Sequence, residues 1–226
     1  MNMKIILFCS CVFLSLIFTD GVFALIDDFN DGNDSGWNRI QGEWSIDNGE
    51  YVQSETEWTT TTTNETYTRS FFGNENWTDY TLEAKVRMEG GGETAAIVGI
   101  FFRVTEKTPE GDYYYFRLDA RAADGPALIK SPNTILQENV NKPSELEQDY
   151  ILKVEVEGDN IKCYIDGELE IELQDDSFPS GAVGVGTFNT QGYFDDVSVN
   201  GEGIAPNPVS SEGKLAATWA LIKQDR

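Results

Sequence analysis

Residues 80–88, with the sequence YTLEAKVRM, decide the fold class of this 226-residue chain. Apolar side chains occupy every second position from Tyr80 to Met88, and Thr, Glu, Lys and Arg lie between them. An alternation of period two puts the apolar residues on one face of an extended strand, so the stretch predicts a half-buried β-strand. The next apolar run, residues 95–104, contains a single charge, Arg103, and predicts a central strand covered on both faces.

The same pattern extends to both sides of these two stretches. Asp47-Asn48-Gly49 separates two short apolar runs and predicts a tight hairpin. Residues 152–156, 161–165, 169–173, 182–188 and 193–199 continue the alternation, with Gly, Asn and Asp between them. About a dozen such strands in one sheet would leave a face exposed, so they predict two packed antiparallel sheets. The expected fold is all-β, a two-sheet antiparallel sandwich over residues 25–200.

The two ends of the chain differ from this middle part. Residues 1–24 combine Lys4, an apolar run and Val22-Phe23-Ala24, which is typical of a secretory signal peptide cleaved after Ala24. An uncleaved membrane anchor is the alternative, although the apolar run is shorter than the ~20 residues that span a bilayer. Residues 201–213 have the composition of a linker.

The last segment, residues 214–226, predicts a short helical tail. Leu215, Trp219 and Ile222 recur at helical spacing over about three turns, which is too short for a stable isolated helix. It is expected to fray or to dock on the sandwich, or else to serve as an attachment or sorting segment.

The charge and composition exclude several classes of function. The chain has no histidine, which rules out a Ser/His/Asp triad, a Cys/His dyad and an imidazole-bound metal. A formal net charge of −23 repels nucleic-acid backbones and anionic lipid surfaces. Cleavage after Ala24 would remove Lys4 and Asp20, one charge of each sign, and leave the exported chain equally acidic. Cations and neutral sugars remain as partners.

Five short motifs resemble concanavalin A-like, laminin-G-like jelly rolls, in particular small secreted carbohydrate-binding modules. The motifs are Asp27-Asp28-Phe29-Asn30-Asp31-Gly32, Gly42-x-Trp44-x-Ile46-x-x-Gly49-x-Tyr51, Tyr164-Ile165-Asp166-Gly167-Glu168, Phe178-Pro179-Ser180-Gly181 with Gly184 and Gly186, and Phe194-Asp195-Asp196-Val197-Ser198-Val199. The resemblance covers residues 25–200. It implies a sandwich whose first and last strands lie side by side, a structural calcium ion and a variable sugar-binding surface.

A calcium site would use carboxylates from the two ends of this domain. Without histidine, and with Cys163 as the only cysteine after residue 24, any metal must bind oxygen ligands, which favours calcium. Asp27 and Asp28 would lie near Asp195 and Asp196 if the terminal strands pair. Asp28 and Asp196 are the first choice as ligands, whereas acidic residues in turns are otherwise simply solvated.

Residues 113–121, YYYFRLDAR, carry the strongest signal for binding. One side of this strand is apolar, and the other combines aromatic rings with charged groups that can pair with sugar hydroxyls. The predicted carbohydrate-binding residues are Tyr113, Tyr115, Arg117, Asp119 and Arg121, with Arg103 from a neighbouring strand and Trp58 from a loop. The alternative is structural: the tyrosines cover the sheet and Arg117 pairs with Asp119.

Catalysis of glycoside hydrolysis would need two carboxylates facing each other across a cleft. Glu168, Glu170 and Glu172 alternate with Leu169, Ile171 and Leu173, and are the candidate set. A solvated outer strand face, with the three apolar residues buried, explains the same pattern.

Three functions follow from these observations. The first is a secreted, non-catalytic, lectin-like domain that binds a polysaccharide or glycan and is stabilised by calcium. The second is a glycoside hydrolase on the same fold. The third is a structural or adhesion protein of the cell surface, held by its tail.

Overall fold

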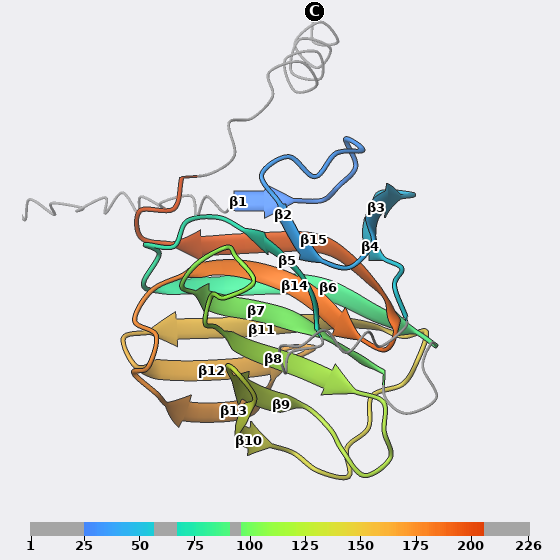
Figure 1. Ribbon diagram of the computed structural model, residues 1–226. Coiled ribbons are helices and arrows are strands. Elements are labelled where there is room, and N and C mark those ends of the chain that lie inside the picture. Colours follow the sequence, from blue (N-terminus) through green and yellow to red (C-terminus); the bar gives the residue numbers. More distant parts are fainter. Residues whose placement is uncertain (1–24, 57–66, 91–95, 206–226) are drawn as a thin grey trace, which may run out of the picture.

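The computed structural model describes residues 25–56, 67–90 and 96–205, and every regular element in these ranges is a β-strand (Figure 1). The predicted signal peptide (1–24) and helical tail (214–226) lie outside the described residues, as does most of the predicted linker (201–213). None of the described residues belongs to a helix that could cross a membrane.

The strands form two antiparallel sheets. The eight-stranded sheet has the order β13-β12-β11-β6-β15-β4-β3, and β1 also pairs with β15. Its strands are β1 (Leu25–Asp27), β3 (Trp44–Asp47), β4 (Glu50–Gln53), β6 (Tyr80–Glu89), β11 (Asp149–Glu157), β12 (Asn160–Ile165), β13 (Glu168–Gln174) and β15 (Gln191–Gly201).

The second sheet has seven strands in the order β10-β9-β8-β7-β14-β5-β2. Its strands are β2 (Asn38–Gln41), β5 (Thr68–Phe72), β7 (Ile97–Val104), β8 (Tyr114–Asp119), β9 (Ala127–Lys130), β10 (Thr134–Glu138) and β14 (Ala182–Phe188). The predicted two-sheet antiparallel sandwich is therefore confirmed.

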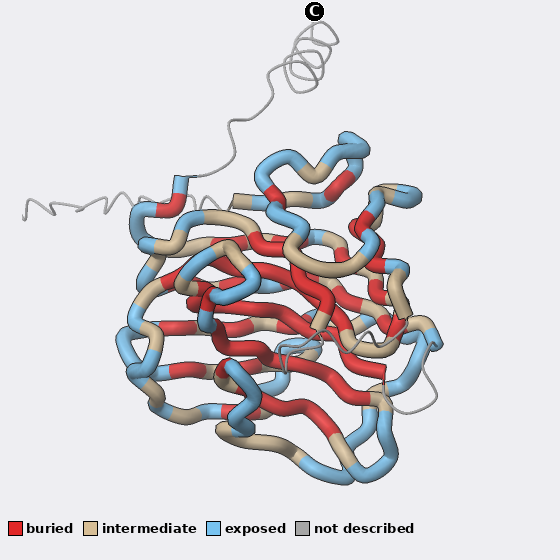
Figure 2. The backbone as a smooth tube through the Cα atoms, in the orientation of Figure 1, coloured by how far each residue is buried: buried red, intermediate tan, exposed pale blue. Residues whose placement is uncertain are grey.

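The main hydrophobic core lies between the sheets and takes side chains from both. In β6 the alternate residues from Tyr80 to Met88 are buried, as the period of two predicts. Every residue of β7 is buried, which confirms a central strand covered on both faces. Figure 2 shows the consequence: the middle strands of the seven-stranded sheet are buried along their length, and exposed residues gather at the loops.

The first and last strands lie side by side. Leu25 pairs with Val199 and Asp27 with Val197, which confirms the arrangement that the family resemblance implies. The predicted hairpin joins β3 to β4, with Asn48 and Gly49 at positive φ. Such backbone angles are typical of this kind of turn.

Candidate functional site

The outer face of the seven-stranded sheet carries a second hydrophobic cluster, which includes residues of β5, β7, β8, β9 and β14. Tyr113 and Tyr115 belong to this cluster and are buried, and so are Arg117 and Asp119. The expectation that these four side chains form an exposed face is therefore wrong, because β8 is covered on both sides. Ring contacts account for part of the cover: Tyr67 packs on Tyr115 with 4.9 Å between ring centroids.

Two glycines let the aromatic rings of this face lie close to the backbone. A Cβ on Gly99 would lie 2.8 Å from Cε2 of Tyr115, and one on Gly186 would lie 2.7 Å from Cε2 of Phe101. Both distances are too short for any side chain. The Tyr115 hydroxyl donates to the carbonyl of Gly186 at 3.0 Å, and its ring stacks on Phe101 at 4.1 Å. Tyr115 is thus held over the sheet instead of projecting from it.

Beside the tyrosines, Asp119 lies between two guanidinium groups. Arg117 Nη1 donates to Asp119 Oδ2 at 2.5 Å, and Arg121 Nη2 donates to the same oxygen at 2.5 Å. The backbone N–H of Arg121 donates to Asp119 Oδ1 at 3.0 Å. The structural alternative, an Arg117–Asp119 pair, is confirmed.

The two arginines shift the pKa of the Asp119 carboxyl. Burial alone would raise the pKa of the Asp119 carboxyl, but the hydrogen bonds from Arg121 and the nearby charge of Arg117 outweigh it and hold this pKa below its ordinary value. Asp119 is therefore ionised at neutral pH. The hydrogen bond to Asp119 raises the pKa of Arg121 in return.

Glu138 completes this group and was missed by the sequence analysis. Glu138 on β10 pairs with Ala127 on β9, and Ala127 pairs with Arg117 on β8. The side chains of Glu138 and Arg117 therefore lie on the same outer face of the sheet. Glu138 Oε1 is 3.5 Å from Arg117 Nη2. The irregular register between Ile135 and Gln137 places Glu138 on this face, and no sequence period reports such a bulge. We call Arg117, Asp119, Arg121 and Glu138 the arginine–carboxylate cluster.

The cluster contains two buried polar atoms without hydrogen-bond partners, Nε of Arg117 and Oε1 of Glu138. The first is a donor and the second an acceptor. Buried polar groups normally have hydrogen-bond partners, so these two atoms on neighbouring side chains are the polar groups of the cluster that a bound group or water would satisfy. The rim is open to solvent, since the Arg121 side chain is 41% exposed and that of Glu138 is 17% exposed.

The two remaining predicted binding residues do not join the cluster. Arg103 adopts a positive φ of 50° at the end of β7, next to an irregular register with β14. Its guanidinium donates to the carbonyls of Phe178 at 2.9 Å and Gly158 at 3.1 Å, at the other end of β7 from Ile97, the residue that pairs with Asp119. Trp58 lies outside the described residues.

The three glutamates of β13 do not form one row. The register between β12 and β13 shifts at Cys163 and Tyr164, which interrupts the alternation. Leu169 is consequently 49% exposed, so its predicted burial is wrong, whereas Ile171 is buried as predicted. Glu170 accepts from Asn139 Nδ2 at 3.1 Å and forms an ion pair with a lysine, while Glu172 lies 3.4 Å from Lys162.

The predicted calcium ligands lie at the two paired ends of the domain. Asp27 Oδ2 accepts from Trp37 Nε1 at 2.8 Å, and burial raises the pKa of Asp27 despite this bond. The Asp28 carboxylate accepts from the backbone of Asn30. Asp195 accepts from the N–H of Asp196 and lies 3.8 Å from a lysine. Within residues 25–56, 67–90 and 96–205 no three His, Cys, Asp or Glu side chains gather as a metal site. Calcium binding stays a prediction.

Comparison with known proteins identifies the family and the fold of this chain. Residues 24–200 match the family model described as a 3-keto-alpha-glucoside-1,2-lyase-like domain. Among solved structures, the carbohydrate-binding module CBM66 from Bacillus subtilis has a TM-score of 0.62 and 22% identity, covering 75% of this chain and 98% of that one. This likeness confirms a jelly roll of the concanavalin A-like kind.

Two curated relatives are larger proteins. The extracellular exo-alpha-L-arabinofuranosidase of Streptomyces chartreusis is 28% identical over 156 residues, which are 66% of this chain and 17% of that protein. The levanase of Bacillus subtilis (strain 168) is 25% identical over 169 residues, which are 74% of this chain and 23% of that protein. The chain therefore spans less than a quarter of either relative.

Proposed function

Because the chain belongs to the 3-keto-alpha-glucoside-1,2-lyase-like domain family, we propose that it is an exported β-sandwich that binds a polysaccharide or glycan without cleaving it. The arginine–carboxylate cluster is the proposed binding site. Support comes from the match across 98% of a carbohydrate-binding module.

One observation carries the assignment of the site: Nε of Arg117 and Oε1 of Glu138 are buried and make no hydrogen bond, although Oε1 lies 3.5 Å from Arg117 Nη2. A sugar hydroxyl donates one hydrogen bond and accepts others, so a single hydroxyl can satisfy both atoms. With Asp124, which lies 2.9 Å from Arg121 Nε, three carboxylates accompany the two arginines, so the site carries a formal charge of about −1 and suits a neutral sugar better than a uronic acid. Tyr115 and the rest of the aromatic face support the cluster from beside it, instead of stacking on the ligand.

Glycoside hydrolysis is the second candidate, and the names of the two relatives favour it, whereas the family description names a lyase. The geometry supports it less. Asp119 is held between two guanidinium groups, so it is poorly placed to act as an acid or a nucleophile. The glutamates of β13 are separated by the register shift.

The test is a glycan array with the full chain, run with calcium and with a chelator. The matched variants are Glu138→Ala, which removes the acceptor oxygens of Glu138 from the cluster, and Glu172→Ala, which removes an exposed glutamate on the other sheet. We expect binding to neutral glycans that is lost in Glu138→Ala and kept in Glu172→Ala. Equal binding by both variants would contradict the assigned site, and no binding by folded protein would favour a structural or adhesion role. Products released from a bound glycan would instead establish the hydrolase.

A further inference from the structure

One shielded carboxylate has no part in the arginine–carboxylate cluster, although the sequence singles it out. The side chain of Glu170 on β13 is 8% exposed. The register between β12 and β13 pairs Leu169 and Ile171 but passes over Glu170 between them. A residue at such a bulge is left out of the ladder, and its side chain is turned to a new direction. The carbonyl and the carboxylate of Glu170 can therefore bond outside their own sheet.

Glu170 joins the open edges of the two sheets. β13 is the edge strand of the eight-stranded sheet and β10 that of the seven-stranded sheet, and the two lie next to each other in Figure 1. Asn139, the residue after β10, donates from Nδ2 to the Glu170 carbonyl at 3.0 Å and to Glu170 Oε2 at 3.1 Å. The other carboxylate oxygen, Oε1, forms an ion pair with Lys142. One residue of β13 thus holds the loop that leaves β10.

This bond fixes the residue beside Glu138. β10 ends at Glu138, and as an edge strand it is held on one side by β9. A bulge interrupts the register of β10 before that end. Strand ends of this kind open first, because few hydrogen bonds hold them. The bond from Asn139 to Glu170 therefore restricts where the Glu138 carboxylate can lie.

The same loop also supports the other side of the cluster, because residues 139–144 run beside residues 119–126. Three backbone N–H groups of the first segment donate to carbonyls of the second: Asn139 to Pro126 at 3.0 Å, Lys142 to Asp124 at 3.1 Å and Ser144 to Asp119 at 2.9 Å. A Cβ on Gly125 would lie 2.1 Å from the carbonyl oxygen of Asn139, so the two backbones touch. The second segment contains Asp119 and Arg121 of the cluster. Both sides of the cluster thus depend on the loop that Glu170 holds.

We propose that Glu170 is a positioning residue of the glycan site: it holds Asn139, and through it Glu138 and residues 119–126, in the arrangement that receives a sugar. Glu170 itself does not touch the sugar. This inference rests on the proposed function. A site that is already ordered spares its ligand the cost of ordering it, so the bond between the two edge strands raises the affinity for a glycan.

The first test measures affinity by titrating the full chain with the neutral glycan that gives its strongest signal on the glycan array. Glu170→Ala should weaken binding by about tenfold, because a shielded hydrogen bond to a charged group is lost. Glu170→Gln keeps an oxygen that can accept from Asn139 and loses an ion pair with Lys142, whose side chain is 54% exposed. It should bind within about threefold of the parent chain, since exposed ion pairs contribute little.

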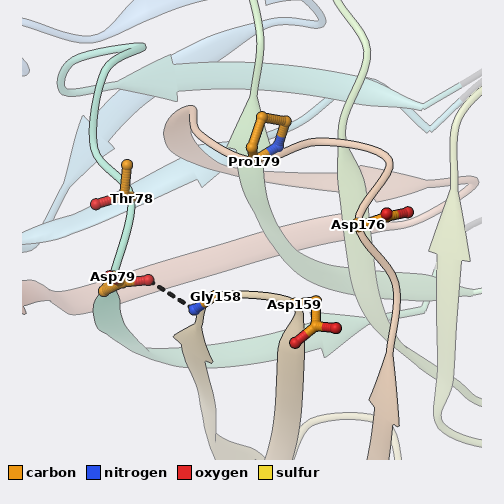
Figure 3. Close-up of a pocket in the computed structure, with 6 residues that line it drawn as sticks. All are labelled: Thr78, Asp79, Gly158, Asp159, Asp176 and Pro179. Carbon is orange, nitrogen blue, oxygen red and sulfur yellow. Dashed lines mark hydrogen bonds between the residues drawn. The ribbon is translucent and has the colours of Figure 1, made fainter.

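A matched control separates positioning from general stability. Asp79 accepts from the N–H of Gly158 at 2.8 Å, the bond drawn in Figure 3, and so also ties two connections together. Gly158 is bonded to Arg103, at the opposite end of β7 from the residue that pairs with Asp119. Asp79→Ala should therefore lower the midpoint of thermal unfolding and leave glycan affinity unchanged.

The second test needs no glycan. Amide hydrogen exchange at Asn139, Lys142 and Ser144 should be about tenfold faster in Glu170→Ala than in the parent chain, and unchanged in Asp79→Ala. Adding Glu170→Ala to Asn139→Ala should weaken glycan binding no further, because the two residues act through one bond.

The outcomes separate this inference from the proposed function. If the parent chain binds a neutral glycan and Glu170→Ala binds it equally well, or if Glu170→Gln loses as much affinity as Glu170→Ala, the positioning role is wrong and the glycan site stands. Unchanged hydrogen exchange in Glu170→Ala would also overturn the positioning role. If the folded parent chain binds no neutral glycan, the proposed function falls and the positioning role falls with it.

Discussion

Replacing Gly99 by alanine should destabilise the protein, although alanine is normally the better residue inside a strand. A Cβ at this position would lie 2.2 Å from the carbonyl oxygen of Phe116 and 2.8 Å from Cα of Arg117, both backbone atoms of β8. The ring of Tyr115 is equally close. Backbone in the middle of a sheet cannot withdraw as a flexible side chain can, so β7 and β8 must separate.

The magnitude follows from two opposing effects. Overpacking of a filled site costs about 1–3 kcal/mol, and two backbone contacts below 3 Å place Gly99→Ala at the upper end. Alanine also restricts the unfolded chain more than glycine does, which stabilises the folded protein by about 0.4–1 kcal/mol. A net loss of about 2 kcal/mol lowers the midpoint of thermal unfolding by about 4–8 °C in a domain of this size.

The measurement is thermal and urea unfolding of Gly99→Ala beside Gly90→Ala. A Cβ on Gly90 meets only Cδ1 of Leu146, at 3.9 Å, so this control should be neutral or slightly stabilised. If Gly99→Ala were as stable as the parent protein, the account of rings and strands packed against bare glycine backbone would be wrong.

Five further outcomes are expected. Tyr80→Phe should cost about 1–3 kcal/mol in urea unfolding, because the Tyr80 hydroxyl accepts from the buried N–H of Arg103 at 2.7 Å and that donor would lose its partner. Asp119→Asn should cost about 3–5 kcal/mol, since it leaves Arg117 buried beside a neutral group. The lowered pKa of Asp119 means that its stabilising contribution is complete above about pH 4 and is lost as the pH falls through the folded pKa, which acid unfolding of the parent and of Asp119→Asn will compare. Calcium bound at the paired termini should raise the midpoint of thermal unfolding, and a chelator should reverse this rise. Cleavage of residues 1–24 as a signal peptide should give an exported protein that begins at Leu25, which N-terminal sequencing will check.

The sequence predicted the strands well where one period governs them. In β6 each polar residue faces away from the core and each apolar residue faces into it, so the alternation from Tyr80 to Met88 was sufficient. The β3–β4 hairpin followed from Asp47-Asn48-Gly49 in the same way, because its turn is a local property of three residues. Pairing of the first and last strands came from the family resemblance and not from any period.

The candidate site was predicted only in part. Arg117, Asp119 and Arg121 do form one charged group, but the aromatic residues beside them are buried. An alternation of aromatic and charged residues indicates two different faces, and it does not say which face is in contact with water. Tyr115 lies over the sheet because Gly99 on the adjacent strand β7 leaves room for its ring, and because its hydroxyl reaches the carbonyl of Gly186 on β14, one strand further away. Both relations join residues far apart in the chain.

What the sequence determined by itself is the class of the fold and the chemistry that it excludes: a two-sheet sandwich without histidine and with a large negative charge. What the tertiary structure decided is which side chains meet. Glu138 joins Arg117 through a bulge in β10, Arg103 turns away through a positive φ, and Leu169 becomes exposed through a shift between β12 and β13. The physical reason is that one irregular residue in a strand reverses the direction of the side chains near it, and such irregularities depend on pairing with distant strands.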